Sequence, residues 1–137
     1  MSASTLVVDT NILAYLYLPG DFTAAAEDLL QAQPDWAAPV LWRSEFRNIL
    51  AGFMRRGSLS LEQACAIQLE AQSLLAGREF DVDSQTVLSL VKQSDCSAYD
   101  CEFVALAHQL GTRLATEDKK VLRNFPKVAF SMLAMQH

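Results

Sequence analysis

The chain has 137 residues, of which 51% are hydrophobic and 20% are charged, and its formal net charge is −5. This composition excludes a disordered chain, and no apolar run approaches the roughly 18 residues that a membrane-spanning helix needs. We therefore assign residues 1–137 to a single folded domain that does not contact a membrane. The first residues lack the positive charges of a secretory signal, so we expect the protein in the cytoplasm.

The pattern of apolar residues and turn residues predicts short strands that alternate with helices. In chain order, we expect a strand at 5–9, helices at 11–18 and 22–33, a strand at 35–39, helices at 40–56 and 60–76, a strand at 78–82, helices at 84–93 and 98–110, a strand at 112–116, a helix at 118–125 and a strand at 127–132.

Strands that are separated by helices imply a parallel sheet, because parallel neighbours need crossover connections. The sequence therefore predicts an α/β fold, a three-layer α/β/α sandwich with a central parallel sheet. The first strand does not alternate between apolar and polar residues, which predicts that both of its faces are buried. Ligands bind beyond the carboxyl ends of such strands, where Asp9 and Asp118 are expected.

Two further acids lie on predicted helices, where a solvent-facing acid would normally have a cation three or four residues away. Glu45 has none, and its neighbours on the helix include Trp42 and Ile49. Asp100 is followed by Phe103 along an apolar stripe. Both acidic side chains are therefore expected to face inward.

Local roles are the alternative interpretation of these acids. Asp9 and Asp118 could each cap the helix that follows, and Asp100 could complete a capping box at the start of its helix. Asp81 and Asp83 also lie at the end of a predicted strand, but we interpret them as solvated acids, with Asp83 as a helix cap.

The topology would bring four carboxylates to one end of the sheet, which purely local roles do not explain. Carboxylates that lie close together cannot all stay ionised unless a cation holds them or their pKa values rise. His108 and His137 have no partner at ligand spacing, and the three cysteines form no C-x-x-C motif. An oxygen-only ligand set predicts Mg²⁺ or Mn²⁺. The candidate catalytic and metal-binding residues are Asp9, Glu45, Asp100 and Asp118.

The negative net charge at first argues against a nucleic-acid partner. Removing the four candidate carboxylates changes the formal charge from −5 to −1, and one bound divalent ion makes it +1. Basic residues also gather at 43–56 and 113–127. An acidic protein can thus offer a metal-loaded cleft, rimmed by cations, to a polyanion such as RNA. The candidate RNA-binding residues are Arg43, Arg47, Lys119 and Lys120.

Four acidic segments occur in a recognisable order, LVVDTNIL, SEF, SAYDCEFVALA and LATEDKKVL. In order, spacing and flanking apolar runs they resemble a PIN domain, and in size the chain is similar to a VapC-type toxin. The resemblance spans nearly the whole chain and implies a parallel sheet between helices. It also implies a Mg²⁺-dependent endoribonuclease that uses the four candidate acids and is the toxic half of a bacterial toxin–antitoxin pair.

The resemblance implies supporting residues and partners as well. Thr10 and Asn11 match the residues after the family's first acid, and Thr116 matches the hydroxyl before its last acid. Glu117 is an extra acid in the last segment, which leaves open whether Glu117 or Asp118 faces the metal. The implied partners are an RNA substrate, a VapB-like antitoxin whose tail enters the active-site groove, and a second copy of the chain. They would form a homodimer, and a heterotetramer or larger complex with the antitoxin.

For the reaction, we expect the acids to hold the metal so that a bound water attacks phosphorus in line. Asp9, Asp100 and Asp118 are the expected direct ligands. Glu45 binds through water or orients the nucleophile, because its longer side chain reaches in from a flanking helix. The alternatives are a DNA-cleaving enzyme of the same fold, and a non-catalytic module that acts with its antitoxin in a DNA-bound regulatory complex.

Overall fold

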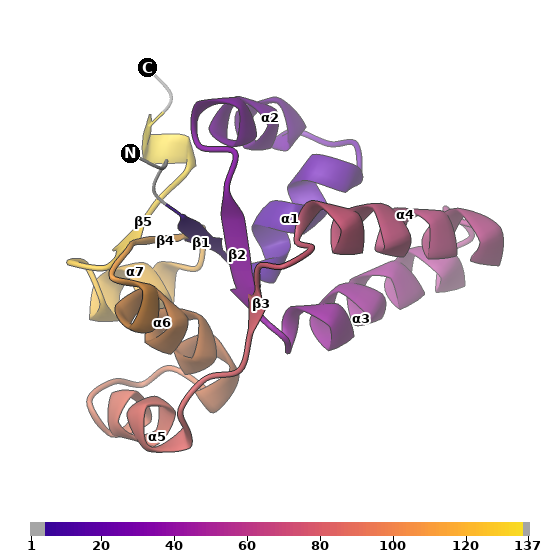
Figure 1. The fold of residues 1–137 in the computed structure, drawn as a ribbon. Helices are drawn as coiled ribbons and strands as arrows, with labels where there is room; N and C mark the ends of the chain where they lie inside the picture. Colours follow the sequence, from indigo (N-terminus) through magenta and orange to yellow (C-terminus); the bar gives the residue numbers. More distant parts are fainter. Residues whose placement is uncertain (1–4, 136–137) are drawn as a thin grey trace.

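The computed structural model describes residues 5–135 (Figure 1). Within them, the strands are β1 (Leu6–Val8), β2 (Trp36–Pro39), β3 (Glu79–Phe80), β4 (Leu114–Ala115) and β5 (Ala129–Phe130). The α-helices are α1 (Thr10–Tyr17), α2 (Thr23–Ala32), α3 (Trp42–Arg55), α4 (Leu61–Leu74), α5 (Ser84–Lys92), α6 (Ala98–Leu110) and α7 (Lys119–Asn124). A 3₁₀ turn, η1 (Leu133–Met135), follows β5. Each predicted strand and helix is present near its expected place, whereas η1 was not predicted.

The strands form one parallel sheet in the order β3-β2-β1-β4-β5. Strand β1 lies at the centre, where Leu6 pairs with Trp36 of β2 and Val7 pairs with Leu114 of β4. All three residues of β1 are at most 1% exposed, as their unbroken apolar run predicted. The predicted α/β class with a central parallel sheet is therefore confirmed.

Helices cover both faces of this sheet (Figure 1). The chain moves along the sheet in one direction from β1 to β3, and then crosses back to add β4 and β5 on the other side of β1. Right-handed crossovers therefore place α1 to α4 on one face and α5 to α7 on the other. Helix α6 packs against β1, β2 and β4, while α3 and α4 form a hairpin that projects away from the sheet. The three layers are those of the predicted sandwich.

The reversal of direction at β1 defines where a ligand can bind. In open parallel sheets, a crevice forms at the carboxyl ends of the strands where the order reverses. Here that position lies between the ends of β1 and β4. The backbone N–H of Asp9 donates to the carbonyl of Ala115 at 3.2 Å, so the residues after the two strands are held side by side.

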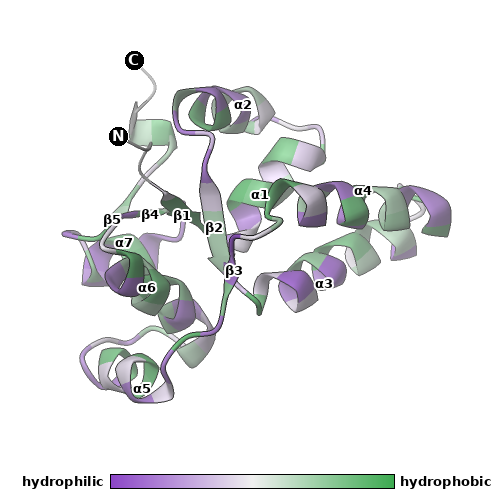
Figure 2. Cartoon of the chain, viewed as in Figure 1, coloured by the Kyte–Doolittle hydropathy of each residue, from purple (hydrophilic) through white to green (hydrophobic). Residues whose placement is uncertain are grey.

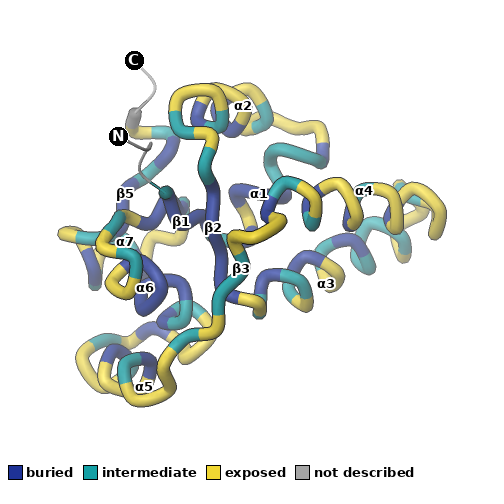
Figure 3. Tube along the Cα trace, viewed as in Figure 1, coloured by how far each residue is buried: buried dark blue, intermediate teal, exposed yellow. Residues whose placement is uncertain are grey.

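Buried aromatic side chains fix α3 against the rest of the core. Strand β1 is coloured as hydrophobic in Figure 2 and as buried in Figure 3, whereas exposed positions lie on the outside of the helices (Figure 3). Trp42 and Phe46 are fully buried, with ring centroids 5.7 Å apart, and Tyr17 of α1 lies 6.4 Å from Phe46. Because Glu45 lies on α3 between Trp42 and Phe46, this packing also sets the direction of its side chain. Across residues 5–135, the structure contains no helix with the length and apolar character needed to span a bilayer.

Leu106 of α6 is fully buried, so Leu106→Ala is expected to lower the free energy of unfolding by about 2 to 5 kcal/mol. The matched control is Leu88→Ala on α5, because Leu88 is 62% exposed and its truncation should change stability by less than about 0.5 kcal/mol. Urea denaturation measures both variants. Equal effects would contradict the packing of α6 against the sheet.

Candidate active site

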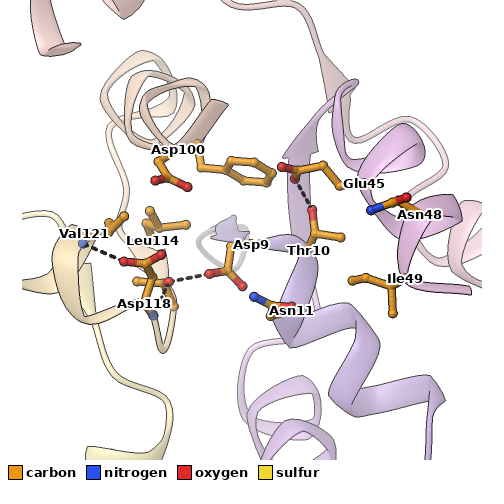
Figure 4. Close-up of a pocket in the computed structure, with 12 residues that line it drawn as sticks. Asp9, Thr10, Asn11, Glu45, Asn48, Ile49, Asp100, Leu114, Asp118 and Val121 are labelled. Atoms are coloured by element: carbon orange, nitrogen blue, oxygen red, sulfur yellow. Dashed lines mark hydrogen bonds between the residues drawn. The ribbon is translucent and has the colours of Figure 1, made fainter. Parts of the chain in front are cut away.

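A pocket of about 240 Å³ opens at the carboxyl ends of β1 and β4 (Figure 4). The four predicted acids all line it, although they come from four separate segments of the chain. Figure 4 shows Asp9 between Asp118 on one side and Glu45 on the other. The predicted supporting residues that line it are Thr10, Asn11 and Thr116.

Asp9 is held by several contacts where β1 ends and α1 begins. Its Oδ1 accepts a hydrogen bond from the backbone N–H of Ile12 at 3.1 Å, which caps α1. Its Oδ2 accepts a hydrogen bond from the Thr116 hydroxyl. The local role as a cap and the position in the pocket therefore coexist in one side chain.

Asp118 follows β4 in a similar way. Its Oδ1 accepts from the backbone N–H of Val121 at 3.0 Å and caps α7, while its own N–H donates to the Thr116 hydroxyl oxygen at 3.0 Å. Because that hydroxyl also donates to Asp9, Thr116 connects the two aspartates. Thr116 is only 1% exposed, so bulk water does not compete for these bonds.

The other two acids reach the pocket from helices on opposite faces of the sheet, Glu45 from α3 and Asp100 from α6. The Thr10 hydroxyl donates to Glu45 Oε1 at 2.6 Å, so the residue after Asp9 orients this second carboxylate. At the start of α6 the cap is Ser97, whose side chain accepts from the Asp100 N–H at 3.0 Å. The cap of α6 therefore leaves the Asp100 carboxylate free for the pocket.

Glu117, the extra acid of the last segment, points elsewhere. Its carboxylate accepts from the Ser131 hydroxyl at 2.7 Å and from the Leu133 N–H at 3.2 Å. It thus anchors the segment after β5, and it does not line the acidic pocket. Of the two adjacent acids, Asp118 is the one that the structure brings to Asp9.

Burial raises the pKa of the Asp9 carboxyl from 3.8 to about 7. The hydrogen bonds from Thr116 and Ile12 oppose this shift, whereas the negative charges of Asp118 and Glu45 add to it. The charged form of Asp9 is therefore unfavourable in this pocket unless a positive charge compensates it.

The pKa of the Glu45 carboxyl is raised as well. Burial is the main cause that raises its pKa, the charge of Asp100 raises it further, and the hydrogen bond from Thr10 opposes the rise. None of the four acids belongs to an ion pair among the described residues. The ion pairs found there are Arg43–Glu79, Arg78–Asp35 and Arg123–Asp95.

The chemistry of the donor set fits a hydrated hard cation. Within residues 5–135, no three acidic, histidine or cysteine side chains converge into a cluster that could hold a metal ion by themselves. The oxygen donors instead lie around the wall of the pocket. Mg²⁺ keeps several waters and binds through few carboxylates, while a structural zinc site needs a closed set of four ligands. The arrangement therefore suits Mg²⁺ or Mn²⁺ and not a structural zinc ion.

None of the predicted RNA-binding cations lines the acidic pocket, and all four are among the described residues. Arg43 binds Glu79 through Nε and Nη2, at 2.6 and 2.7 Å, so its charge is already compensated. Arg47 donates to a serine on the same helix at 3.1 Å. Lys119 and Lys120 are exposed in the first turn of α7, directly after a pocket acid, and are the better placed of the four.

Two polar residues near the acids were not singled out from the sequence. Asn48 lines the pocket one helical turn after Glu45, and that spacing of three residues was the available signal. Glu102 lies close enough to Glu45 for the charge of Glu45 to add to the rise in its pKa, which burial mainly causes. No sequence signal distinguished Glu102, because its proximity to Glu45 arises only when α3 and α6 meet.

Other residues considered from the sequence lie away from the pocket. Asp83 accepts from the Thr86 N–H at 2.9 Å and caps α5, as predicted, and Asp81 is exposed. His108 is exposed in the last turn of α6. His137 lies outside the described residues.

Residues 6–130 match the PIN domain family, so the chain belongs to that family. This confirms the resemblance inferred from the four acidic segments. The chain is 27% identical over 124 residues to Ribonuclease VapC3 from Pyrobaculum aerophilum, and the match covers 88% of this chain and 95% of that protein.

Solved structures share the fold. The crystal structure of PAE2754 from Pyrobaculum aerophilum matches with a TM-score of 0.77 and 20% identity, over 98% of this chain and 95% of that chain. A chain of a toxin-antitoxin complex from Klebsiella pneumoniae matches with a TM-score of 0.65 and 17% identity, over 96% of this chain and 98% of that chain. These likenesses establish a common architecture.

The raised pKa of Asp9 predicts how pH changes the stability of the metal-free protein. Between 3.8 and about 7, the folded state keeps a proton that the unfolded chain has released. The free energy of unfolding should therefore fall as pH rises through this window, by at most about 1.4 kcal/mol per pH unit. Asp9→Asn keeps the cap oxygen but cannot ionise, so it should remove this part of the dependence.

Urea denaturation in EDTA, at about pH 5 and about pH 7.5, measures the effect in the wild type and in Asp9→Asn. Parallel pH profiles in the two proteins would show that Asp9 ionises normally in the fold.

Proposed function

We propose that the protein is an endoribonuclease that depends on Mg²⁺ or Mn²⁺, and that it is the toxin of a bacterial toxin–antitoxin pair. One observation carries this proposal: four acids from separate segments line one pocket without an ion-pair partner among the described residues. Membership of the PIN domain family and the likeness to Ribonuclease VapC3 support RNA as the substrate.

The residues that would hold the cation, directly or through its retained waters, are Asp9, Asp100 and Asp118, with Glu45 acting through water or orienting the nucleophile. A bound divalent ion supplies Lewis-acid chemistry, because it makes a nearby water more acidic and stabilises negative charge on a phosphate. Retaining the ion requires the carboxylates to be ionised, so binding and activity are expected to increase with pH as Asp9 loses its proton.

The two threonines act as positioning residues. Thr116 holds the carboxylate of Asp9 and the backbone of Asp118, and Thr10 holds Glu45. Carboxylates that are fixed before substrate binds need no reorganisation during the reaction, which is the main source of electrostatic catalysis. Each threonine lies next to or near one acid in the sequence and bonds to a carboxylate from a distant segment, so Thr116 and Thr10 orient Asp9 and Glu45.

Glu45 has the properties of a proton acceptor. Its pKa is raised, chiefly by burial, and a base works best when its pKa lies nearer the working pH. It reaches the pocket from α3, whereas Asp9 and Asp118 lie at strand ends. We propose that Glu45 accepts the proton of the attacking water, while the aspartates bind the cation.

We propose that a VapB-like antitoxin binds the protein and covers the pocket. The likeness to a chain of a toxin-antitoxin complex from Klebsiella pneumoniae supports an antitoxin partner. We further propose a homodimer that forms a heterotetramer or larger complex with the antitoxin, and action in the cytoplasm, where both RNA and antitoxin are made.

Purified protein is expected to cut single-stranded RNA in Mg²⁺ or Mn²⁺ and to stop when EDTA removes the ion. Asp9→Asn should abolish cleavage without unfolding, because Asn keeps the cap acceptor. Gel analysis of labelled RNA and a thermal melt measure the two effects. Undiminished cleavage in EDTA would overturn the metal-dependent mechanism.

The same pair of proteins tests the toxin role in cells. Inducible expression of the wild type in a bacterial host should stop growth and produce new RNA ends, whereas Asp9→Asn should do neither. Growth arrest by both proteins, with no new RNA ends, would argue for the non-catalytic alternative.

Asp118 and Glu117 are adjacent acids, so their variants provide a matched comparison of RNA cleavage. Asp118→Asn should reduce cleavage by more than the roughly 10- to 100-fold that loss of an outer-shell partner of a metal causes. Glu117→Gln should cost less than about 10-fold, because Glu117 contacts the segment after β5 and not the pocket. Initial rates at saturating Mg²⁺ measure both variants, and the reverse order of effects would reassign the ligand to Glu117.

A further inference from the structure

A second hollow, of about 390 Å³, adjoins the acidic pocket. Asn11 and Ile49 line both cavities, and Figure 4 shows these two residues at the edge of the acidic pocket. The remaining wall comes from α1, from the turn between α1 and α2, from the first residue of α2, and from α3. We call this cavity the aromatic hollow, because Tyr15, Phe22 and Phe53 line it.

One face of α3 runs along both cavities. Glu45, Ile49 and Phe53 follow one another at intervals of four residues, which places them on the same side of a helix. Glu45 lines the acidic pocket, Ile49 lines both cavities, and Phe53 lines the aromatic hollow. A ligand that lies along this face would therefore reach from the acids into the hollow.

Two of the three rings form a supported pair. The centroids of Tyr15 and Phe22 are 5.0 Å apart and their planes meet at 81°, which is an edge-to-face contact. Phe22 is nevertheless 37% exposed. It is the residue that directly precedes α2. An exposed ring that a neighbour holds in place offers a surface on which a planar group can stack.

A cation lies beside the hollow and an acid lines it. The Arg56 guanidinium lies 4.6 Å from the centre of the Phe53 ring and is exposed to solvent, where it can meet a phosphate. Asp21, in contrast, lines the hollow itself. A carboxylate repels a phosphate there, but it can accept a hydrogen bond from the amino group of a base.

We propose that the aromatic hollow binds one nucleobase of single-stranded RNA, beside the phosphate that is cut in the acidic pocket. In a polynucleotide, phosphates and bases alternate, which matches the order of Glu45, Phe53 and Arg56 along α3 and its C-terminal end. Stacking accepts any base, whereas a paired base inside a duplex cannot enter a cavity. The inference rests on the proposed function, because it concerns the substrate of the same site.

Binding of a short single-stranded RNA tests the role of the ring. Asp9→Asn serves as the parent protein, because it is expected not to cut the probe, and fluorescence anisotropy in Mg²⁺ measures Kd. Adding Phe22→Ala should weaken binding about 5- to 100-fold, as expected for one lost base stack. Phe22→Trp should retain affinity, whereas Phe22→Leu, which keeps apolar bulk without a ring, should lose it.

The matched control for this series is Leu61→Ala, because Leu61 is a 65% exposed apolar residue on α4 and lines neither cavity. It should leave Kd unchanged. A thermal melt of each variant separates lost affinity from lost folding. If Phe22→Ala unfolds, the test of binding uses Phe22→Leu instead.

Abasic probes identify which nucleotide enters the hollow. Each probe lacks one base, and its position is counted from the bond that the wild type cuts. One probe, with its abasic position beside that bond, should bind the protein with Phe22 more weakly than the intact RNA does. In Phe22→Ala, the same probe and the intact RNA should bind with equal affinity. Such non-additivity is the signature of a direct contact. If no position shows it, the hollow does not hold a base.

The outcomes separate this inference from the proposed function. If the wild type cuts RNA but the Phe22 variants bind and cut as before, the inference is wrong and the ribonuclease proposal stands. If Phe22→Ala weakens binding of a cognate antitoxin and leaves RNA binding intact, the hollow is a protein-docking site and the inference is again wrong. If the folded wild type neither binds nor cuts RNA, both proposals fall.

Discussion

The burial of one carboxylate at the end of the central strand governs the rest of the site. Strand β1 is fully enclosed, and Asp9 follows it directly, so burial raises the pKa of this acid to about 7. No cation among the described side chains offsets it. Proteins tolerate such unfavourable groups mainly at functional sites, where a ligand supplies the missing charge. The hydroxyl of Thr116 partly compensates by donating to Asp9, and it also fixes Asp118.

Helix caps explain how the fold holds these acids in place before any ligand binds. Asp9 and Asp118 each use Oδ1 to accept from the first turn of a helix, while Asp9 Oδ2 also accepts from Thr116. The same geometry places the positive end of the α1 dipole near Asp9, where it favours negative charge. A local role and a chemical role are therefore compatible. At Asp100 the two are divided, because Ser97 provides the cap instead.

The sequence by itself determined the alternation of strands and helices, the parallel sheet, and which four acids line the pocket. These features leave short-range signals, since helix periodicity, caps and turn residues act over a few positions. Glu45 and Asp100 were recognisable because an acid on an apolar helix face, with no cation one turn away, is a local anomaly. The unbroken apolar run of β1 likewise predicted its complete burial.

Only the tertiary structure decided which long-range partners these residues meet. Glu117 turns away from the pocket because Ser131 and Leu133, 14 and 16 residues later, supply its hydrogen-bond donors. Arg43 is compensated by Glu79, 36 residues away, and does not line the pocket, although it belongs to a basic segment of the sequence. The aromatic hollow arises in the same way, from the packing of α1, the turn before α2, and α3. Such contacts depend on how separate elements pack, and no local pattern of residues encodes that arrangement.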